Sequence, residues 1–312
     1  MRAIVLKGFG GIENLVMEDL PIPVPLTDDV LIQAKAISIN PVDVKTRAGK
    51  GAAGRIKTEN PIILGWDVSG VVTESQSPLF AKGDEVFGMV RFPGHGKAYA
   101  DYIAAPAAQL ARKPAGIPHT EAAAACLACL TAWQAFTKHV RIQPSQRVLV
   151  HAAAGGVGHY AVQIAKYFGA YVIGTASAAN RDFVLSLGAD EHVDYKAQRL
   201  EDAVKDVDIV LDTIGGDNID KSLPVIRKGG TIVSIPSGLN ELVAEKAKAM
   251  GINGLSFLVH SSGEDMAGFA PLLENGAIKS HVSQVFSFVD MGQAHLQIES
   301  GRTRGKVALT LA

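Results

Sequence analysis

The chain has 312 residues, a net charge of −1, 47% hydrophobic residues and two cysteines. This length predicts about two domains that each bury a core. The near-neutral charge argues against nucleic acid or an anionic membrane surface as partner, and no apolar run approaches the roughly 20 residues of a membrane-spanning helix. No signal-peptide pattern is present at the N-terminus, and few cysteines favour a reducing compartment. We therefore expect a cytoplasmic protein without disulfides.

The first part of the chain, from Met1 to about Pro118, is predicted to be rich in β-strands. Short apolar runs alternate there with turn clusters, at residues 3–6, 30–36, 70–73, 85–90 and 99–104. Their irregular spacing predicts a compact, partly closed barrel. The glycine-rich stretch 49–54 has two open interpretations, a mobile lip over a cleft or a plain loop.

A helix is predicted over residues 120–137, and it contains both cysteines. The spacing Cys126-x-x-Cys129 allows a redox pair or half of a metal site. No second pair exists to complete four ligands, and the helix is apolar. We therefore favour two small side chains packed in a core.

A glycine turn joins a predicted strand at 148–150 to a helix at 160–168, and a second strand follows at 171–175. The turn contains Ala153-x-Gly155-x-x-Gly158, so alanine replaces the first glycine of the G-x-G-x-x-G pattern. Unpaired N–H groups at a helix start favour an anion, and glycine lets a pyrophosphate approach the backbone. This βαβ unit predicts a dinucleotide site; the alternative is a turn that only packs a helix on a sheet.

The end of the second predicted strand distinguishes the two nicotinamide cofactors. An NAD site usually has an acid there, for the ribose 2′-hydroxyl. Residues 174–181 contain no acid, but they include Ser177 and Arg181, which are suited to a 2′-phosphate. Tyr195 follows the next predicted strand and is placed to cover the same phosphate. These residues favour NADP over NAD.

Strands and helices alternate from Arg147 to about Ser261, with further strands at 209–211, 231–235 and 254–259. This alternation predicts a doubly wound parallel sheet of the α/β class, which binds ligands at the carboxyl ends of its strands. The apolar last strand, 255–259, is expected at the sheet edge, where it would pair with a second copy of the chain. A helix at 263–276 and a strand at 307–311 follow.

Short motifs spread along the chain carry a family resemblance. They are residues 39–43 (INPVD), 65–70 (GWDVSG), 99–102 (YADY), 130–133 (LTAW), 153–158 (AAGGVG) and 305–307 (GKV). In their order and spacing the chain resembles the medium-chain dehydrogenases/reductases, in their zinc-independent NADPH:quinone oxidoreductase branch. The resemblance implies a GroES-like substrate domain at 1–118 and 262–312, a Rossmann NADP-binding domain at 119–261, and NADPH in the cleft between them.

The resemblance also implies roles for individual residues. It places Asn40 and Thr131 near the nicotinamide, as catalytic candidates that orient it or donate to the substrate oxygen. Trp66 is either a wall of the substrate pocket or part of the core. The remaining positions that match cofactor contacts of the family are Gly155, Gly156, Val157, Ser177, Arg181, Tyr195, Ser237, Phe257, Val259 and Lys306.

Zinc-dependent relatives hold their catalytic metal with Cys, His and Cys, at positions that correspond here to Asn40, Trp66 and Leu127. None of these side chains supplies the nitrogen or thiolate that zinc prefers. The four-cysteine lobe of those enzymes is missing too. We therefore expect no bound metal and no zinc-polarised alcohol chemistry.

Without a metal, the hydride acceptor must already be electrophilic, as quinones and α,β-unsaturated carbonyls are. Enoyl-thioester reductases usually carry a tyrosine proton donor in the loop after the Asn-Pro motif, but residues 47–54 contain none. A proton would then come from water, or a hydroquinone product would need no such donor. His95, between two glycines, is a weak candidate for an acid.

Three functions follow from these observations. The first is an NADPH-dependent quinone reductase, and an alkenal or enone double-bond reductase uses the same residues. The second is an NADPH-binding sensor or structural protein with little turnover. The third, a zinc alcohol dehydrogenase, predicts stoichiometric metal.

Overall fold

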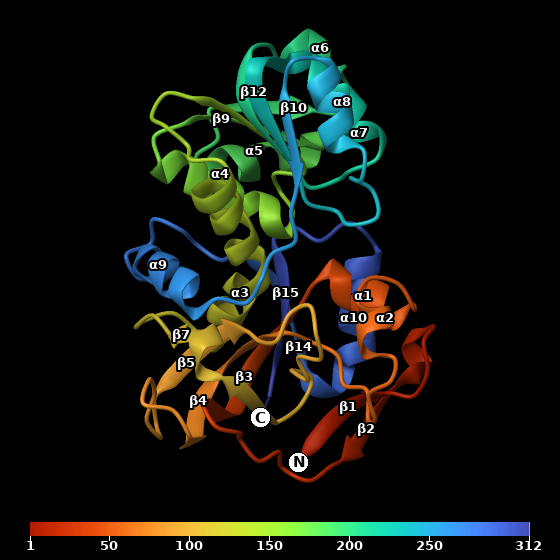
Figure 1. Cartoon of the computed structure of the whole chain (residues 1–312), viewed down its shortest axis with the longest axis vertical. Helices are drawn as coiled ribbons and strands as arrows, with labels where there is room; N and C mark the ends of the chain where they lie inside the picture. Colours follow the sequence, from red (N-terminus) through yellow and green to blue (C-terminus); the bar gives the residue numbers. More distant parts are fainter. Residues whose placement is uncertain (312) are drawn as a thin grey trace. The chain divides into compact units, whose positions relative to one another are not determined.

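The computed structural model describes residues 1–311 and divides the chain into two compact units (Figure 1). Unit 1 comprises residues 1–130, 259–276 and the chain from 280 onward. Unit 2 comprises residues 131–258 and 277–279. Unit 2 is therefore inserted into unit 1 along the sequence, and unit 1 needs both ends of the chain.

Unit 1 is built on a seven-stranded sheet in the order β14-β15-β3-β4-β5-β7, with β6 paired to β3. A two-stranded antiparallel sheet, β1-β2, accompanies it. The strands are β1 (Arg2–Leu6), β2 (Leu15–Asp19), β3 (Asp29–Ile39), β4 (Asp67–Ser75), β5 (Glu85–Met89), β6 (Tyr102–Pro106), β7 (Leu110–Arg112), β14 (Val282–Ser287) and β15 (Lys306–Thr310).

Strand β3 is the centre of this sheet, because it pairs with β4, β6 and β15 along its 11 residues. Nine of its residues are buried, which explains its nearly continuous apolar sequence. The last strand, β15, lies antiparallel to β3, with Val307 opposite Ile39. This pairing brings Lys306 next to Asn40, the residue that follows β3.

The helices of unit 1 are short. They are α1 (Pro41–Arg47), α2 (Ala53–Ile56), α9 (Gly263–Glu274) and α10 (Met291–Glu299). Helix α1 begins with proline at its first position, where the missing N–H costs nothing. The Asp43 carboxylate accepts a hydrogen bond from the Asn40 backbone N–H at 2.7 Å and caps the same turn.

Unit 2 contains a six-stranded parallel sheet in the order β10-β9-β8-β11-β12-β13 (Figure 1). Its strands are β8 (Arg147–Val150), β9 (Tyr171–Ala176), β10 (Glu191–Asp194), β11 (Val207–Asp212), β12 (Ile226–Ser234) and β13 (Asn253–Ser256). Its helices are α4 (Gly156–Tyr167), α5 (Arg181–Ser186), α6 (Leu200–Ala203), α7 (Asp217–Ser222) and α8 (Val243–Ala249). The chain reverses its direction of winding between β8 and β11, which is where such sheets bind ligands.

Helix α3 (His119–Gln134) carries the boundary between the units, which lies after Leu130. The sequence instead places the boundary at 118/119, before the helix. The reason for the difference is that the first turns of α3 are bonded to β4. The Leu127 backbone N–H donates to Asp67 at 3.0 Å, and the Cys126 thiol approaches the Val68 carbonyl at 3.6 Å.

Both cysteines of α3 are free and fully buried. Burial raises the pKa of each thiol well above its ordinary value, so neither is a ready nucleophile or metal ligand. This agrees with two small side chains packed in a core.

Two local expectations differ from the structure. The strand expected at 254–259 ends at Ser256, and Phe257 instead stacks on the His139 ring with 4.4 Å between centroids. The glycine-rich stretch 49–54 runs into α2, and buried Ala52 and Ala53 tie it to the unit. That stretch is therefore neither a free lip nor a featureless loop.

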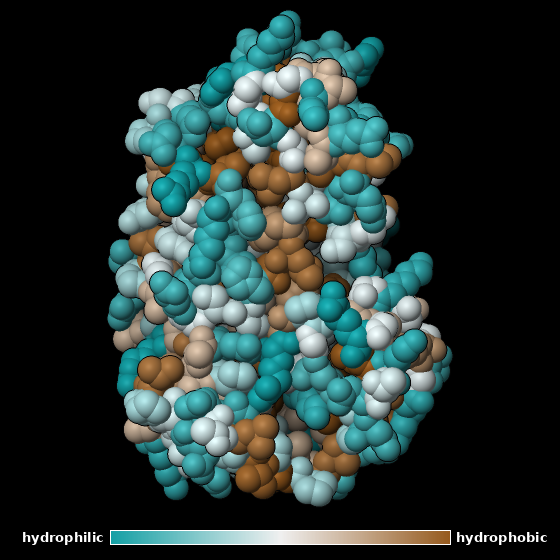
Figure 2. Space-filling model, in the orientation of Figure 1, coloured by the Kyte–Doolittle hydropathy of each residue, from teal (hydrophilic) through white to brown (hydrophobic). Residues whose placement is uncertain are grey.

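The surface is ordinary for a chain of this composition. In Figure 2 most side chains facing the viewer are hydrophilic, and the apolar ones include a continuous stretch in the middle of the view. Among the described residues, no helix has the length and apolarity needed to cross a membrane.

Candidate active site

The turn between β8 and α4 has the geometry that a dinucleotide phosphate needs. Helix α4 begins at Gly156 after the extended residue Gly155, and residues 155–157 are partly exposed. Twelve residues of helix follow, so its N-terminal N–H groups and dipole favour an anion there. The three predicted pyrophosphate residues thus lie at one helix start.

Two close approaches explain the sequence of this turn. A Cβ added to Gly158 would lie 2.2 Å from the Ala152 carbonyl oxygen, so only glycine fits where the helix meets the turn. Ala153 stands at the first glycine position of the pattern. A Cβ added to Gly174 on β9 would lie 2.8 Å from the Ala153 Cβ. The side chain of Ala153 therefore fits because the neighbouring strand has glycine at position 174.

The residues predicted to select the cofactor lie at the ends of two paired strands. Ala176 of β9 is the partner of Asp194 of β10, so Ser177 and Tyr195 leave the sheet side by side. Tyr195 is 61% exposed, and Arg181 begins α5 with an exposed side chain 3.5 Å from Asp182. No acid follows β9 before Asp182, so no carboxylate stands where an NAD site needs one.

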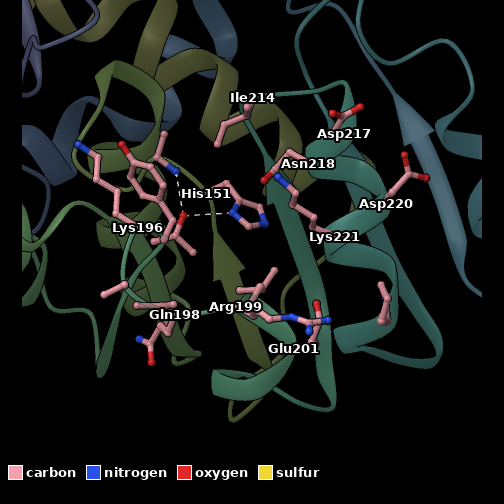
Figure 3. A pocket seen from close by; sticks show the side chains of 17 residues that line it. His151, Lys196, Gln198, Arg199, Glu201, Ile214, Asp217, Asn218, Asp220 and Lys221 are labelled. Atoms are coloured by element: carbon pink, nitrogen blue, oxygen red, sulfur yellow. Dashed lines mark hydrogen bonds and ion pairs between the residues drawn. The ribbon is translucent and has the colours of Figure 1, made fainter.

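A pocket of about 1100 Å³ opens at this edge of the sheet (Figure 3). Its walls include His151 after β8, Thr175 on β9, Tyr195 after β10 and Ile214 after β11. In Figure 3 the His151 ring lies between Lys196 on one side and Asn218 on the other. Side chains of both signs line the rest of the pocket, and its position at four strand ends suits a nucleotide.

His151 is the centre of a directed chain of hydrogen bonds. Ser222 Oγ donates to the Asn218 carbonyl at 2.6 Å, so it accepts from His151 Nε2 at 2.9 Å. His151 Nδ1 then accepts from Thr175 Oγ1 at 3.1 Å, and that oxygen accepts from the Ala152 N–H at 3.3 Å. Burial lowers the pKa of His151 to about 4, so the neutral ring ties the glycine turn to α7.

A buried carboxylate shapes the next strand end. Asp212, the last residue of β11, accepts from the N–H groups of Ile214 and Gly215 at 3.1 Å. It also accepts from Asn218 Nδ2 at 2.8 Å and from Ser234 Oγ at 2.7 Å. These bonds fold the turn after β11 against the end of β12 and so fix one wall of the pocket.

In unit 1 the structure brings two predicted site residues into direct contact. Lys306 Nζ donates to Asn40 Oδ1 and, at 3.1 Å, to the Ile39 carbonyl. Asn40 Nδ2 donates in turn to Asp67 Oδ2 at 2.8 Å. Asn40 is 1% exposed and Lys306 is 3% exposed. Lys306 thus contacts Asn40 directly, and its ammonium donates hydrogen bonds to groups of the protein.

A second set of titratable groups lies behind Asn40. Burial, reinforced by the charge of Asp67, raises the pKa of Asp43 to about 7. The Tyr99 hydroxyl, which interacts with Asp43, lies 3.0 Å from His295 Nε2. Burial and the nearby Arg47 charge lower the pKa of His295 to about 3, so at neutral pH this region adds no imidazolium charge.

The remaining candidates occupy varied positions. Thr131 is fully buried in α3, and Val259 is buried beyond β13. Trp66 is 1% exposed; its indole N–H donates to the Gly94 carbonyl at 2.8 Å and its ring packs edge-on against Phe92. Ser237 lies exposed after β12.

Both ring nitrogens of His95 are held by contacts within the protein. Its Nε2 accepts from the Ile63 backbone N–H at 3.0 Å, while Nδ1 lies 3.0 Å from Glu59. Burial lowers the pKa of His95. A neutral ring held on both sides is poorly suited to the acid role considered for it.

Sequence reasoning missed the two residues that organise these networks, Asp67 and His151. A signal existed for each. Asp67 opens the apolar strand β4, where a carboxylate is costly unless it is paired. His151 directly follows the apolar strand β8, before the glycine turn.

The residues at the positions of the zinc ligands do not form a zinc site. Asn40 and Trp66 use their polar atoms within the protein, and Leu127 offers none. Over residues 1–311, no three His, Cys, Asp or Glu side chains gather in a way that could hold a metal ion. The donor chemistry therefore does not fit a resident zinc.

Comparison with known proteins agrees with this geometry. Residues 27–115 match the family model of the alcohol dehydrogenase GroES-like domain, and residues 187–309 match that of a zinc-binding dehydrogenase. A 2-methylene-furan-3-one reductase from Solanum lycopersicum is 33% identical over 99% of this chain and 79% of its own length.

Solved structures are similar over the full length. A quinone oxidoreductase from Coxiella burnetii has a TM-score of 0.95 at 34% identity, covering 100% of this chain and 99% of its own. The Escherichia coli quinone oxidoreductase, solved with NADPH, has a TM-score of 0.89 at 27% identity and covers both chains completely. The chain therefore belongs to the medium-chain dehydrogenase/reductase superfamily, in its zinc-independent, quinone oxidoreductase-like branch, and is an oxidoreductase that uses a nicotinamide cofactor.

Proposed function

We propose that this protein is an NADPH-dependent reductase that transfers hydride to a quinone or a related electrophilic acceptor. The observation that carries the proposal is that one chain has both a dinucleotide-binding turn, at residues 152–158, and side chains that cannot bind zinc at the three positions of the zinc ligands. Those three residues are Asn40, Trp66 and Leu127. Without a Lewis acid to polarise a carbonyl, the acceptor must be electrophilic by itself.

In this proposal the pyrophosphate binds at the N-terminus of α4, over residues 155–157. Ser177, Arg181 and Tyr195 hold the 2′-phosphate by hydrogen bonds and charge. Ser237, Phe257 and Val259 remain proposed contacts along the rest of the cofactor. When bound, the cofactor supplies a hydride from its nicotinamide ring.

The chain's own contribution to the chemical step is to position and stabilise charge. Hydride transfer to a quinone or to the β-carbon of an enone leaves negative charge on oxygen. Asn40 and Thr131 are proposed to orient the nicotinamide or donate to that oxygen, and Trp66 is proposed to limit the pocket. The proton that completes the reduction comes from water, because residues 47–54 offer no tyrosine.

Cofactor choice is tested by measuring NADPH and NADH dissociation constants for the wild type and Arg181→Ala. We expect tighter binding of NADPH, and a loss of that preference of about tenfold or more when the guanidinium is removed. Arg227→Ala is the control. Arg227 is hydrogen-bonded to Asp208 near the start of β12, so it lies at the amino ends of the strands, away from the carboxyl ends where the cofactor is proposed to bind. Equal binding of both cofactors to the wild type would overturn the assignment.

The acceptor class is tested by following NADPH oxidation with a panel of simple quinones and of alkenals and enones. Quinone turnover supports the main proposal. A second candidate, an enone reductase, is favoured by the relative named for a methylene-furanone, itself an α,β-unsaturated ketone. Tight NADPH binding without turnover of either class would instead favour the sensor or structural role.

We also propose a homodimer formed through the edge of the unit 2 sheet. Among residues 1–311, strand β13 pairs with β12 alone, so its other edge is an open sheet edge. Leu258, just beyond it, is 44% exposed. Solution scattering is the test: a dimer mass supports the proposal, and a monomer mass at micromolar concentration contradicts it.

A further inference from the structure

The Asp67 carboxylate is fully buried and surrounded by donors. Its Oδ2 accepts from Ser38 Oγ at 2.6 Å and from Asn40 Nδ2 at 2.8 Å, and its Oδ1 accepts from the Leu127 N–H at 3.0 Å. Lys306 Nζ lies 3.7 Å from Oδ2. Burial raises the pKa of Asp67, but the charge of Lys306 and these hydrogen bonds oppose the rise. Four donors directed at one side chain stabilise its anionic form.

The Lys306 ammonium is the matching cation. It donates hydrogen bonds to the Ile39 carbonyl and to Asn40 Oδ1, and it forms an ion pair with the Asp67 carboxylate at 3.7 Å. Burial lowers the pKa of Lys306, and Asp67 and Asp43 oppose that change. Lys306 is 3% exposed, and its ammonium is held by these protein groups.

The Asn40 amide lies between these two charges. A cation binds its oxygen and an anion binds one hydrogen of its nitrogen, so neither end can rotate or exchange. The cation on the amide oxygen draws electron density away from the nitrogen and strengthens both N–H donors, while the anion that accepts one of them partly offsets this effect at the other. An asparagine amide has two N–H bonds, and the structure gives Nδ2 one protein acceptor, Asp67.

The position of Asp67 in the chain supports a role for this cluster near the reacting groups. Asp67 follows Trp66 directly and bonds to Asn40 and to the backbone of Leu127. These are the three positions that correspond to the metal ligands of zinc-dependent relatives.

We propose that Lys306 and Asp67 are positioning residues that lock and polarise the Asn40 amide, so that its second N–H stabilises the oxygen that becomes negative during reduction. This inference rests on the proposed reductase function. In the step itself, the hydride and its electron pair move to the acceptor and the charge moves to the acceptor oxygen. Asn40 keeps its protons, and water supplies the proton to that oxygen.

The test removes both charges while keeping a polar side chain at each position. The double variant Asp67→Asn/Lys306→Gln leaves no unpaired charge and offers an amide in place of each ion. We expect a folded protein with unchanged NADPH affinity and a kcat reduced by about 10- to 100-fold. Adding Asn40→Ala to the double variant should lower kcat little further, whereas Asn40→Ala alone in the wild type should lower it strongly. Lys82→Gln, at an exposed lysine of unit 1, is the control.

A series of acceptors distinguishes polarisation from a merely structural role. The loss of kcat in the double variant should grow as the acceptor becomes less electrophilic, because more charge stabilisation is then required of the protein. A double variant with kcat within twofold of the wild type across the series would overturn the inference. A wild type that binds NADPH but reduces no acceptor would overturn the proposed function, and this inference with it.

If the double variant does not fold, the wild type provides the measurement. The kcat at saturating substrate should fall at alkaline pH, below the ordinary lysine pKa of 10.5, while NADPH binding persists. The titratable groups that face Lys306 are Asp67 on β4, Asp43 on α1 and Cys126 on α3. The pKa of Asp43, about 7, lies below that range. Burial raises the pKa of Asp67 and the charge of Lys306 opposes the rise, and burial raises the pKa of Cys126 well above its ordinary value. A kcat that stays flat up to pH 10.5 contradicts the inference.

Discussion

Both units bury a polar cluster beside residues of the candidate active site. One cluster is held by opposite charges and the other by hydrogen bonds between neutral groups. The cluster of unit 1 holds opposite charges, on Lys306 and Asp67, with Asn40 between them. The chain through His151 in unit 2 is neutral and is held by hydrogen bonds of fixed direction. A charged cluster fixes an electrostatic field, whereas a neutral one fixes geometry.

The difference matches the two tasks proposed for the units. Binding the phosphates requires a rigid turn, and in the proposed function the dipole of α4 and the Arg181 guanidinium supply the positive charge. Stabilising an oxyanion requires positive potential at one point, which a buried ammonium supplies in a low-dielectric environment. The comparison predicts that the two clusters respond differently to loss of a partner and to pH.

The largest effect is expected from breaking the ion pair of unit 1. Lys306→Ala leaves Asp67 buried without its cation and Asn40 Oδ1 without a donor. The free energy of unfolding should fall by about 5 kcal/mol, the upper end for a broken buried pair. Urea denaturation of the purified variant measures it.

The matched control for that substitution is Asp67→Asn/Lys306→Met, which removes both charges. It should recover most of the lost stability, since a neutral buried pair pays no desolvation penalty. Equal destabilisation by the single and double variants would show that packing, rather than charge, dominates at Lys306.

The next effect is a pH dependence caused by Asp43 in unit 1. Its pKa is raised from 3.8 to about 7, so the folded protein binds a proton more tightly than the unfolded chain. The wild type should therefore lose stability relative to Asp43→Asn as pH rises from 3.8 to 7, by on the order of 4 kcal/mol. Denaturation curves at pH 4, 5.5 and 7 for both proteins provide the comparison. A difference that does not change with pH would contradict the raised pKa.

A smaller effect of opposite sign is expected from His151 in unit 2. Its pKa is lowered from 6.5 to about 4, so the unfolded chain binds the proton more tightly. The wild type should lose about 3 kcal/mol relative to His151→Gln as pH falls from 6.5 to 4. Glutamine keeps one donor and one acceptor for Ser222 and Thr175. His260→Gln, at an exposed histidine, is the control.

The sequence was most informative about unit 2, because its signals are local. Strands β8 and β9 and the turn between them lie within 30 residues, and the absence of an acid after β9 needs no tertiary information. The alternation of strands and helices also limits the topology to a few possibilities. The glycine at 174 that compensates for Ala153 is visible only once the strands are paired.

The cluster of unit 1 could not be derived in the same way. Lys306 and Asn40 are 266 residues apart, and their contact depends on β15 pairing with β3. Sequence motifs marked both residues, but nothing local indicates that one binds the other. The boundary inside α3 was missed for a similar reason, since hydrogen bonds to β4 assign its first turns to unit 1.

The insertion of unit 2 into unit 1 has a consequence for the order in which the protein is made on the ribosome. Asn40 and Asp67 leave the exit tunnel before unit 2 is made, whereas Lys306 is translated after all of unit 2. Until β15 inserts between β14 and β3, Asp67 lacks the counter-charge that its burial requires, while unit 2 can already fold. Unit 1 is therefore completed only after unit 2 has been made, and reductase activity should first appear with it.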